Sequence, residues 1–154
     1  MAGAARKSPL VIGVGNPLRG DDGLGAFVAQ ELRKKLAGAA TVIEHSGEGA
    51  GLMEAWRDHD FVIVVDAVSS GAEAGKIFRL AADEEPIPAR FFNYSTHAFS
   101  LAEAVELART LNKLPKRLII YGVEGRAFGN GEAISESVRQ SARVVIKAVL
   151  SEVL

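Results

Sequence analysis

The sequence contains no cysteine, which excludes disulfide bonds, zinc sites built on thiolates, and thiol nucleophiles. It also lacks any apolar run near the ~20 residues that a membrane-spanning helix needs. Lys and Arg are scattered and the formal net charge is -1, so nothing indicates a surface for nucleic acid or for an acidic membrane. The apolar residues that follow Arg6 and Lys7 are too few for a signal peptide. We therefore expect a cytoplasmic protein that binds neither nucleic acid nor membrane.

What is present predicts one domain over residues 1–154. Hydrophobic residues make up 48% of the chain, which argues against a disordered chain and is enough to fill a core. Apolar or β-branched runs predict strands at Leu10–Val14, Thr41–Glu44, Phe61–Val65 and Leu118–Tyr121, with a fifth, more alternating strand at Lys76–Leu80. Apolar residues at helical spacing predict helices at Leu24–Leu36, Gly51–Arg57, Leu101–Leu111 and Ile134–Leu154.

The alternation of strands and helices predicts an α/β fold, a three-layer α/β/α sandwich around a five-stranded sheet. A nearly continuous apolar run such as Phe61–Val65 is typical of a parallel strand that helices cover on both faces. Lys76–Leu80 follows two glycines and alternates, so we expect it at an edge. An antiparallel direction for that strand would make the mostly parallel sheet a mixed one.

The topology also predicts where the chemistry lies, because loops at the carboxyl ends of parallel strands meet at one edge of the sheet. Asp21 and Asp22 follow the first predicted strand, Asp66 ends the third, and His97 precedes the helix that contains the capping-box spacing Ser100-x-x-Glu103. Carboxylates and an imidazole without thiolates suit a divalent transition metal with an open coordination position.

Each of these residues also has a structural interpretation. Asp21 or Asp22 could be the N-cap of the helix that begins near Gly23. His97 could be an ordinary loop histidine. Asp66 is harder to explain in this way, because a charge at the end of a buried strand needs a partner or a function. Together the residues favour a site more than any of them does alone.

Four segments resemble the hydrogenase maturation endopeptidase family: Gly13-x-Gly-Asn16, Asp21-Asp22-Gly23-x-Gly25, Val65-Asp66-Ala67 and Ser95-Thr-His97. The similarity spans most of the chain. The resemblance implies a soluble α/β protease that removes a C-terminal extension from the large-subunit precursor of a nickel-iron hydrogenase after nickel insertion. It places the family's two metal-binding acids on Asp22 and Asp66 and its histidine on His97, as metal ligands and catalytic residues. Gly47–Glu54, between the second predicted strand and helix, and Tyr121–Glu124, after the last predicted strand, also resemble family segments, less specifically. We interpret Gly47, Gly49 and Gly51 as glycines that allow positive φ in a turn.

The resemblance further implies that nickel arrives on the substrate precursor, which is the protein's partner, and it implies no intrinsic cofactor. We expect a monomer. No Gly-x-Ser-x-Gly elbow offers a covalent nucleophile, which favours metal-assisted hydrolysis by an aspartyl-type endopeptidase. In a second mechanism the three residues only recognise nickel and one carboxylate activates water as a general base. We expect alanine at Asp22, Asp66 or His97 to remove processing and leave the fold intact, and Asp21 to tolerate replacement better.

Two other functions remain open at this stage. A glycine-rich turn between strand and helix can bind a nucleotide or dinucleotide, with Glu44 as a ribose-binding acid. However, Leu18 stands where a dinucleotide fingerprint has its third glycine, and no Gly-Lys-[Ser/Thr] motif occurs. A noncatalytic chaperone that senses the metal on its partner would use the same crevice as the protease. His45 and His59 have no partner that spacing identifies, although His45 is placed near the crevice.

Overall fold

The computed structural model describes residues 8–91 and 101–154. Its strands, α-helices and 3-10 helices (η) are, in chain order, β1 (Leu10–Val14), η1 (Gly20–Gly23), α1 (Leu24–Lys35), β2 (Thr41–His45), α2 (Gly49–Trp56), β3 (Phe61–Val68), β4 (Ile77–Ala81), η2 (Ala89–Phe91), α3 (Leu101–Thr110), β5 (Arg117–Glu124) and α4 (Glu136–Val153). Each predicted strand and helix is therefore found. Among the described residues, no helix combines the length and the apolar character that crossing a membrane requires.

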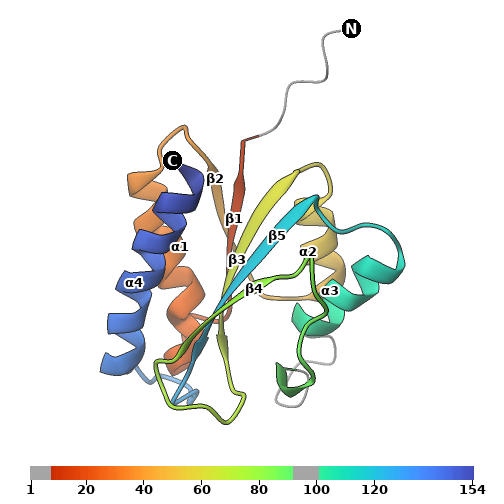
Figure 1. Cartoon of the computed structure of the whole chain (residues 1–154). Helices are drawn as coiled ribbons and strands as arrows, with labels where there is room; N and C mark the ends of the chain where they lie inside the picture. The colour runs from red at the N-terminus through yellow and green to blue at the C-terminus, as the bar shows by residue number, and fades with distance from the viewer. Residues whose placement is uncertain (1–7, 92–100) are drawn as a thin grey trace, which may run out of the picture.

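The five strands form one sheet in the order β2-β1-β3-β5-β4. The pairs β1–β2, β1–β3 and β3–β5 are parallel, while β4 runs antiparallel to β5 at the edge of the sheet. The predicted mixed sheet with an edge strand at β4 is thus confirmed. The carboxyl ends of β1, β3 and β5 lie on the same side of the molecule, where the polar candidates were expected (Figure 1).

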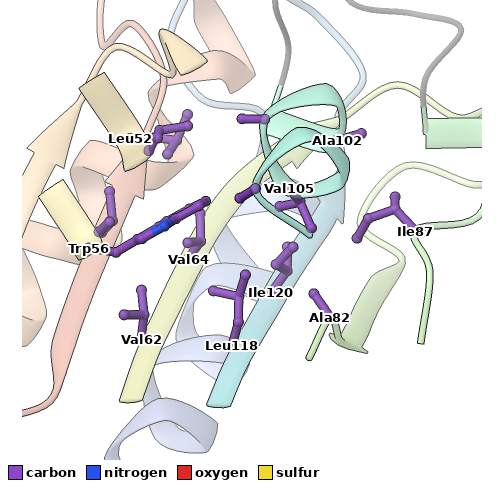
Figure 2. Close-up of a cluster of buried hydrophobic side chains, with 14 of the residues drawn as sticks. Leu52, Trp56, Val62, Val64, Ala82, Ile87, Ala102, Val105, Leu118 and Ile120 are labelled. Atoms are coloured by element: carbon purple, nitrogen blue, oxygen red, sulfur yellow. The ribbon is translucent and has the colours of Figure 1, made fainter. Parts of the chain in front are cut away.

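Two helices cover each face of the sheet and complete the three predicted layers (Figure 1). On one face, α1 and α4 pack apolar side chains such as Val28 and Val145 against Val11 and Ile63. On the other face, α2 and α3 pack against a cluster that includes Leu52, Trp56, Val64, Val105 and Ile120 (Figure 2). The Trp56 side chain is 1% exposed and donates a hydrogen bond from its indole Nε1 to the Lys113 carbonyl at 3.2 Å.

The strands β3 and β5 continue well beyond their predicted ends, Val65 and Tyr121. Asp66 lies inside β3 and pairs with Gly122 of β5, and the ladder extends to the pair of Val68 and Glu124. The prediction that Asp66 ends its strand is therefore wrong by two residues, and Tyr121–Glu124 lies within the last strand instead of after it. Aspartate and glycine are poor strand formers, but the backbone hydrogen bonds between the neighbouring strands outweigh that preference here.

Glycines at the first crossover allow α1 to lie directly against β1. A Cβ added at Gly13 would come within 2.1 Å of the Gly25 carbonyl oxygen, and one added at Gly25 within 2.2 Å of the Val14 carbonyl oxygen. Neither position can hold a side chain unless the helix moves away from the strand. The close contact of β1 and α1 at Gly13 and Gly25 thus holds the loop between them, which carries Asp21 and Asp22, close to the sheet.

We expect Gly13→Ala to lower the free energy of unfolding by ~1–3 kcal/mol, the usual cost of an overpacked core. The new methyl group meets backbone atoms, which cannot rotate away as a side chain can. Urea denaturation followed by circular dichroism measures the change. Gly129→Ala is the matched control, since Gly129 is exposed and its added Cβ would meet only the end of the flexible Glu132 side chain. Equal stability of the two variants would contradict the packing argument.

Candidate active site

A cavity of about 250 Å³ opens at the carboxyl ends of the parallel strands. Its polar lining includes the side chains of Arg19 and Asp22 from the β1–α1 loop and η1, and Asp66 from β3. The rest of its wall comes largely from apolar residues of β4, β5, α3 and the segment before η2. Two of the predicted site residues, Asp22 and Asp66, therefore line the same cavity.

The loop after β1 holds the Asp22 carboxylate in a defined orientation. The Asn16 backbone N–H donates to Asp22 Oδ2 at 2.9 Å, and the Asn16 side chain in turn accepts from the Leu18 N–H at 2.9 Å. Gly15 allows this path, since its φ is +134° and a Cβ there would lie 2.0 Å from the Asp22 carbonyl oxygen. One carboxylate oxygen of Asp22 is thus fixed by the backbone of the Gly-x-Gly-Asn turn.

Asp66 is in an environment that disfavours its charged form. Burial raises the pKa of the Asp66 carboxyl well above its ordinary value of 3.8, and the negative charge of Asp22 raises the pKa further. The Ala67 backbone N–H lowers the pKa, but by less. The two acids therefore repel each other across the cavity. A cation placed between them would offset both this repulsion and the free-energy cost of a buried negative charge.

The third predicted ligand, His97, lies outside the described residues, together with Ser95 and Ser100. Among residues 8–91 and 101–154, no group of three or more His, Cys, Asp or Glu side chains is arranged to hold a metal ion. The described part of the site consequently supplies two carboxylates, that of Asp22 from η1 and that of Asp66 from β3. The roles of Asp22, Asp66 and His97 as metal ligands stay predictions.

Asp21 has a different role from its neighbour. Its side chain is 0% exposed, and it accepts hydrogen bonds from the backbone N–H groups of Arg126, Ala127 and Ser135 at 2.7 to 2.9 Å and from the Ser135 hydroxyl at 2.9 Å. Burial raises the pKa of the Asp21 carboxyl, but these hydrogen bonds outweigh burial and hold the pKa below 3.8. Asp21 thus ties the loop that carries Asp22 to the loop between β5 and α4.

Two predictions about the aspartate pair are corrected by this arrangement. Gly23 stands at the N-cap position of α1 and Arg19 at that of η1, and neither start has a side-chain cap hydrogen bond, so the interpretation of Asp21 or Asp22 as an N-cap is wrong. The expectation that Asp21 tolerates replacement also has to be reversed, because four hydrogen-bond donors depend on this buried carboxylate. No local pattern indicates this role, since its partners lie more than 100 positions away.

A model of the hydrogenase maturation protease family, HycI, matches residues 27–152. The chain belongs to the hydrogenase maturation protease family. The protease is 31% identical over 145 residues to the hydrogenase 2 maturation protease of Escherichia coli, and the match covers 92% of this chain and 88% of that one. The solution structure of an endopeptidase from Escherichia coli has a TM-score of 0.78 and 28% identity over 94% of this chain and 90% of that one.

The hydrogenase maturating endopeptidase HybD from Escherichia coli has the same fold, with a TM-score of 0.77 and 24% identity over 94% of this chain and 91% of that one. Family members are maturation endopeptidases, so the prediction of a peptidase is confirmed. Membership also decides against the nucleotide-binding alternative. Glu44, its suggested ribose ligand, lies 3.5 Å from Arg33 in an ion pair at the protein surface.

Further residues position the loops around the cavity of this protease. Glu124, at the end of β5, is 3% exposed and accepts hydrogen bonds from the backbone N–H and the hydroxyl of Ser70. It thereby fixes the chain that leaves β3 after Val68, close to Asp66 in the same strand. The sequence resemblance indicates this segment of β5, but only the fold shows that the Glu124 carboxylate faces the β3–β4 connection and not the cavity.

The glycine-rich segment before α2 is built for a turn and a helix start. Gly47 has a φ of +95° and lines the cavity, as its interpretation as a turn glycine requires. That interpretation is wrong for Gly49 and Gly51, which lie in α2. Glu48 caps α2 by accepting from the N–H groups of Ala50 and Gly51 at 2.8 Å.

The two described histidines have structural partners. His45 Nδ1 accepts a hydrogen bond from the Gly47 N–H at 2.9 Å, which stabilises the same turn. His59 Nδ1 lies 3.1 Å from the Ser8 carbonyl oxygen. His45 is therefore close to the cavity, as its position in the sequence suggested, but its ring supports the loop and is not among the residues that line the cavity.

Proposed function

We propose that this protease removes the C-terminal extension of a nickel-iron hydrogenase large-subunit precursor after nickel insertion, and that Asp22, Asp66 and His97 contact the nickel that the precursor carries. The observation that supports this most directly is the convergence of Asp22 and Asp66 on one cavity at the sheet edge. Two carboxylates that repel each other in one cavity favour a cation there, and oxygen donors with an imidazole suit a divalent transition metal.

In this proposal the cation is part of the substrate, which explains how cleavage waits for nickel. Without the ion, the repulsion between Asp22 and Asp66 disfavours two ionised carboxylates in the cavity. A precursor that carries nickel relieves this repulsion and gains binding free energy that an empty precursor lacks. The same contacts hold the nearby peptide bond beside the carboxylates, which favours hydrolysis by positioning.

Asp22 and Asp66 have unequal roles within the proposed site. One oxygen of Asp22 accepts a hydrogen bond from the Asn16 N–H. Within residues 8–91 and 101–154 this is the hydrogen bond that the carboxylate makes, so in the proposal the other oxygen binds the cation. Asp66 has a raised pKa, which is the property of a general base that works near neutral pH. Asp66 is therefore our candidate for the group that takes a proton from the attacking water, should nickel serve recognition alone.

The decisive experiment is mass spectrometry of a nickel-loaded large-subunit precursor after incubation with the protease. We expect the loss of one C-terminal peptide from the loaded precursor and no loss from the nickel-free precursor, because only the loaded form supplies the cation. His97→Ala should abolish the cleavage. Asp60→Asn, a change on an exposed loop at the opposite end of β3, is the control and should process the precursor normally.

Other outcomes would contradict specific parts of the proposal. Equal cleavage of nickel-free and loaded precursor would remove nickel recognition and leave a general endopeptidase. Nickel-dependent complex formation without cleavage would indicate the noncatalytic metal-sensing chaperone, which uses the same cavity. Analytical ultracentrifugation of the free protease tests the expected monomer.

A further inference from the structure

The cavity extends well beyond the two carboxylates, and this second part is apolar. Phe78 and Leu80 of β4, Ile120 of β5 and Leu101 and Ala102 of α3 line it. Figure 2 shows Ile87, Ala102 and Ile120, three of its wall residues, on the segment before η2, on α3 and on β5. We call this part of the cavity the apolar chamber.

Gly122 separates the apolar chamber from the carboxylates. Across the sheet, Gly122 pairs with Asp66 on one side and with Phe78 on the other, so these three residues form one row on neighbouring strands. Adjacent strands lie about 4.8 Å apart, which places the Asp66 and Phe78 backbones roughly 10 Å from each other. Gly122 lines the cavity and has no side chain, so no Cβ stands between the acid and the phenyl ring. The nearest side chain at this point is that of Val68, which lines the cavity as well.

The outer wall of the chamber is held in place by hydrogen bonds to α3. The Ile87 N–H donates to Glu106 Oε2 at 3.0 Å, and Arg109 donates to both oxygens of the same carboxylate and to the Glu85 carbonyl. The Phe78 and Phe91 rings contact each other edge to face, with centroids 5.1 Å apart. The chamber is therefore formed in the free protein and does not need a ligand to create it.

From this geometry we infer that the apolar chamber binds one apolar side chain of the precursor, that of a residue directly flanking the scissile bond, and that Gly122 sets the size of side chain accepted. The inference rests on the proposed function. A peptide bond held at Asp22 and Asp66 has its flanking Cα atoms within one residue spacing of 3.8 Å, so the side chains of the two flanking residues are the nearest to Gly122. A cavity of about 150 Å³ lined by apolar side chains holds benzene. The whole cavity here, with the carboxylate end included, measures about 250 Å³, which leaves room for one apolar side chain in its apolar part.

A methyl group at Gly122 is the sharpest test, because the fold can accept it. Its Cβ would lie 3.2 Å from Val68 Cγ1 and 3.9 Å from Phe78 Cβ, so a small shift of one methyl group is sufficient. The methyl would stand in the passage between the carboxylates and the chamber, without contact to either acid. Gly129→Ala adds the same methyl at an exposed loop position and is the matched control.

The experiment uses nickel-loaded precursors in which each residue flanking the mapped cleavage site is changed in turn to Leu, Ala or Asp. At one of the two positions, we expect the wild-type protease to process Leu at least about 10-fold faster than Asp. In Gly122→Ala, the ratio of kcat/KM for Leu over Ala should fall by about 10-fold, the lower range for one methyl in an apolar pocket. Gly129→Ala should keep the wild-type ratio.

The outcomes separate this inference from the proposed function. If the wild-type protease cleaves no nickel-loaded precursor, the proposed function fails and the inference with it. If the wild type cleaves but Gly122→Ala, folded by its melting curve, keeps the wild-type Leu over Ala ratio, the inference alone is overturned. Should Gly122→Ala fail to fold, Phe78→Leu is the second variant, because it enlarges the chamber. It should raise the rate for a precursor with Phe at the selective flanking position, relative to the rate for the Leu precursor. An unchanged ratio of these two rates would overturn the inference.

Discussion

Asp66→Asn is expected to reduce processing of the nickel-loaded precursor by at least about 100-fold, the lower end of the usual loss when a group that transfers a proton in the transition state is removed. The same substitution is expected to raise the melting temperature. The first effect follows if Asp66 binds the cation or accepts the proton of water, since an amide does both poorly. The second follows from the pKa of the Asp66 carboxyl, which burial and the charge of Asp22 raise.

The direction of the stability change follows from proton linkage. Because the folded state binds the Asp66 proton more tightly than the unfolded state does, stability falls as the pH rises from about 3.8 through the raised pKa. At neutral pH the wild type is therefore destabilised by its buried carboxyl group, and the asparagine variant, which does not titrate, is not. Melting curves recorded with a chelator between pH 4 and pH 8 should give a higher melting temperature for the variant. The difference in melting temperature between variant and wild type should increase with pH.

Asp60→Asn is the matched control for both measurements. Asp60 is exposed and lies 3.9 Å from the Lys116 ammonium group, a surface contact that contributes little, so neither processing nor melting should change. A variant Asp66→Asn that is less stable than the wild type at neutral pH would show that Asp66 is a structural residue. Normal processing by this variant would remove Asp66 from the site.

Asp21→Asn is expected to lower the free energy of unfolding by at least about 3 kcal/mol, although the substitution changes neither size nor shape. Both oxygens of Asp21 accept hydrogen bonds, from Arg126 and Ala127 on one side and from Ser135 on the other. In asparagine, one oxygen becomes an NH₂ group that points at an N–H donor, so at least one buried donor loses its acceptor. For a chain of this size the loss corresponds to roughly 6–12 °C in melting temperature.

The neighbouring variant Asp22→Asn makes the same chemical change one residue later and is the control. Its carboxylate accepts one described hydrogen bond, from the Asn16 N–H at the edge of the cavity, so we expect lost processing with little loss of stability. Because the pKa of Asp21 is lowered, its contribution is present above pH 3.8 and disappears as the carboxyl is protonated below that value. Equal stability of the two variants in urea denaturation at pH 7 would contradict the roles given to this pair.

Much of the fold could be predicted because its signals are local. The apolar run Phe61–Val65 and the periodic helices identify the layers, and the rule that parallel strands present their carboxyl ends at one edge brings Asp22 and Asp66 together. The strand ends were less accurate, since the pairing of Asp66 with Gly122 depends on two strands that lie far apart in the sequence. Backbone pairing of this kind leaves no periodic signal in either segment.

The functional division within Asp21-Asp22 could not be predicted from the sequence. Both residues are aspartates at the start of a helix, and only the packing of the β5–α4 loop shows that one faces Ser135 and the other faces the cavity. Gly122 was likewise included in a segment of family resemblance without a role of its own. Its importance depends on its place in the row between Asp66 and Phe78, which is a property of the sheet.

The anchoring of Asp21 also sets when the loop that carries Asp22 can be completed during synthesis of the chain. Asp21 accepts hydrogen bonds from Arg126, Ala127 and Ser135, and Ser135 lies 114 positions later. A nascent chain that ends before Arg126 has none of these groups to hold the loop, and one that ends before Ser135 has only part of them. The anchor is therefore complete only when β5 and the start of α4 have left the ribosome.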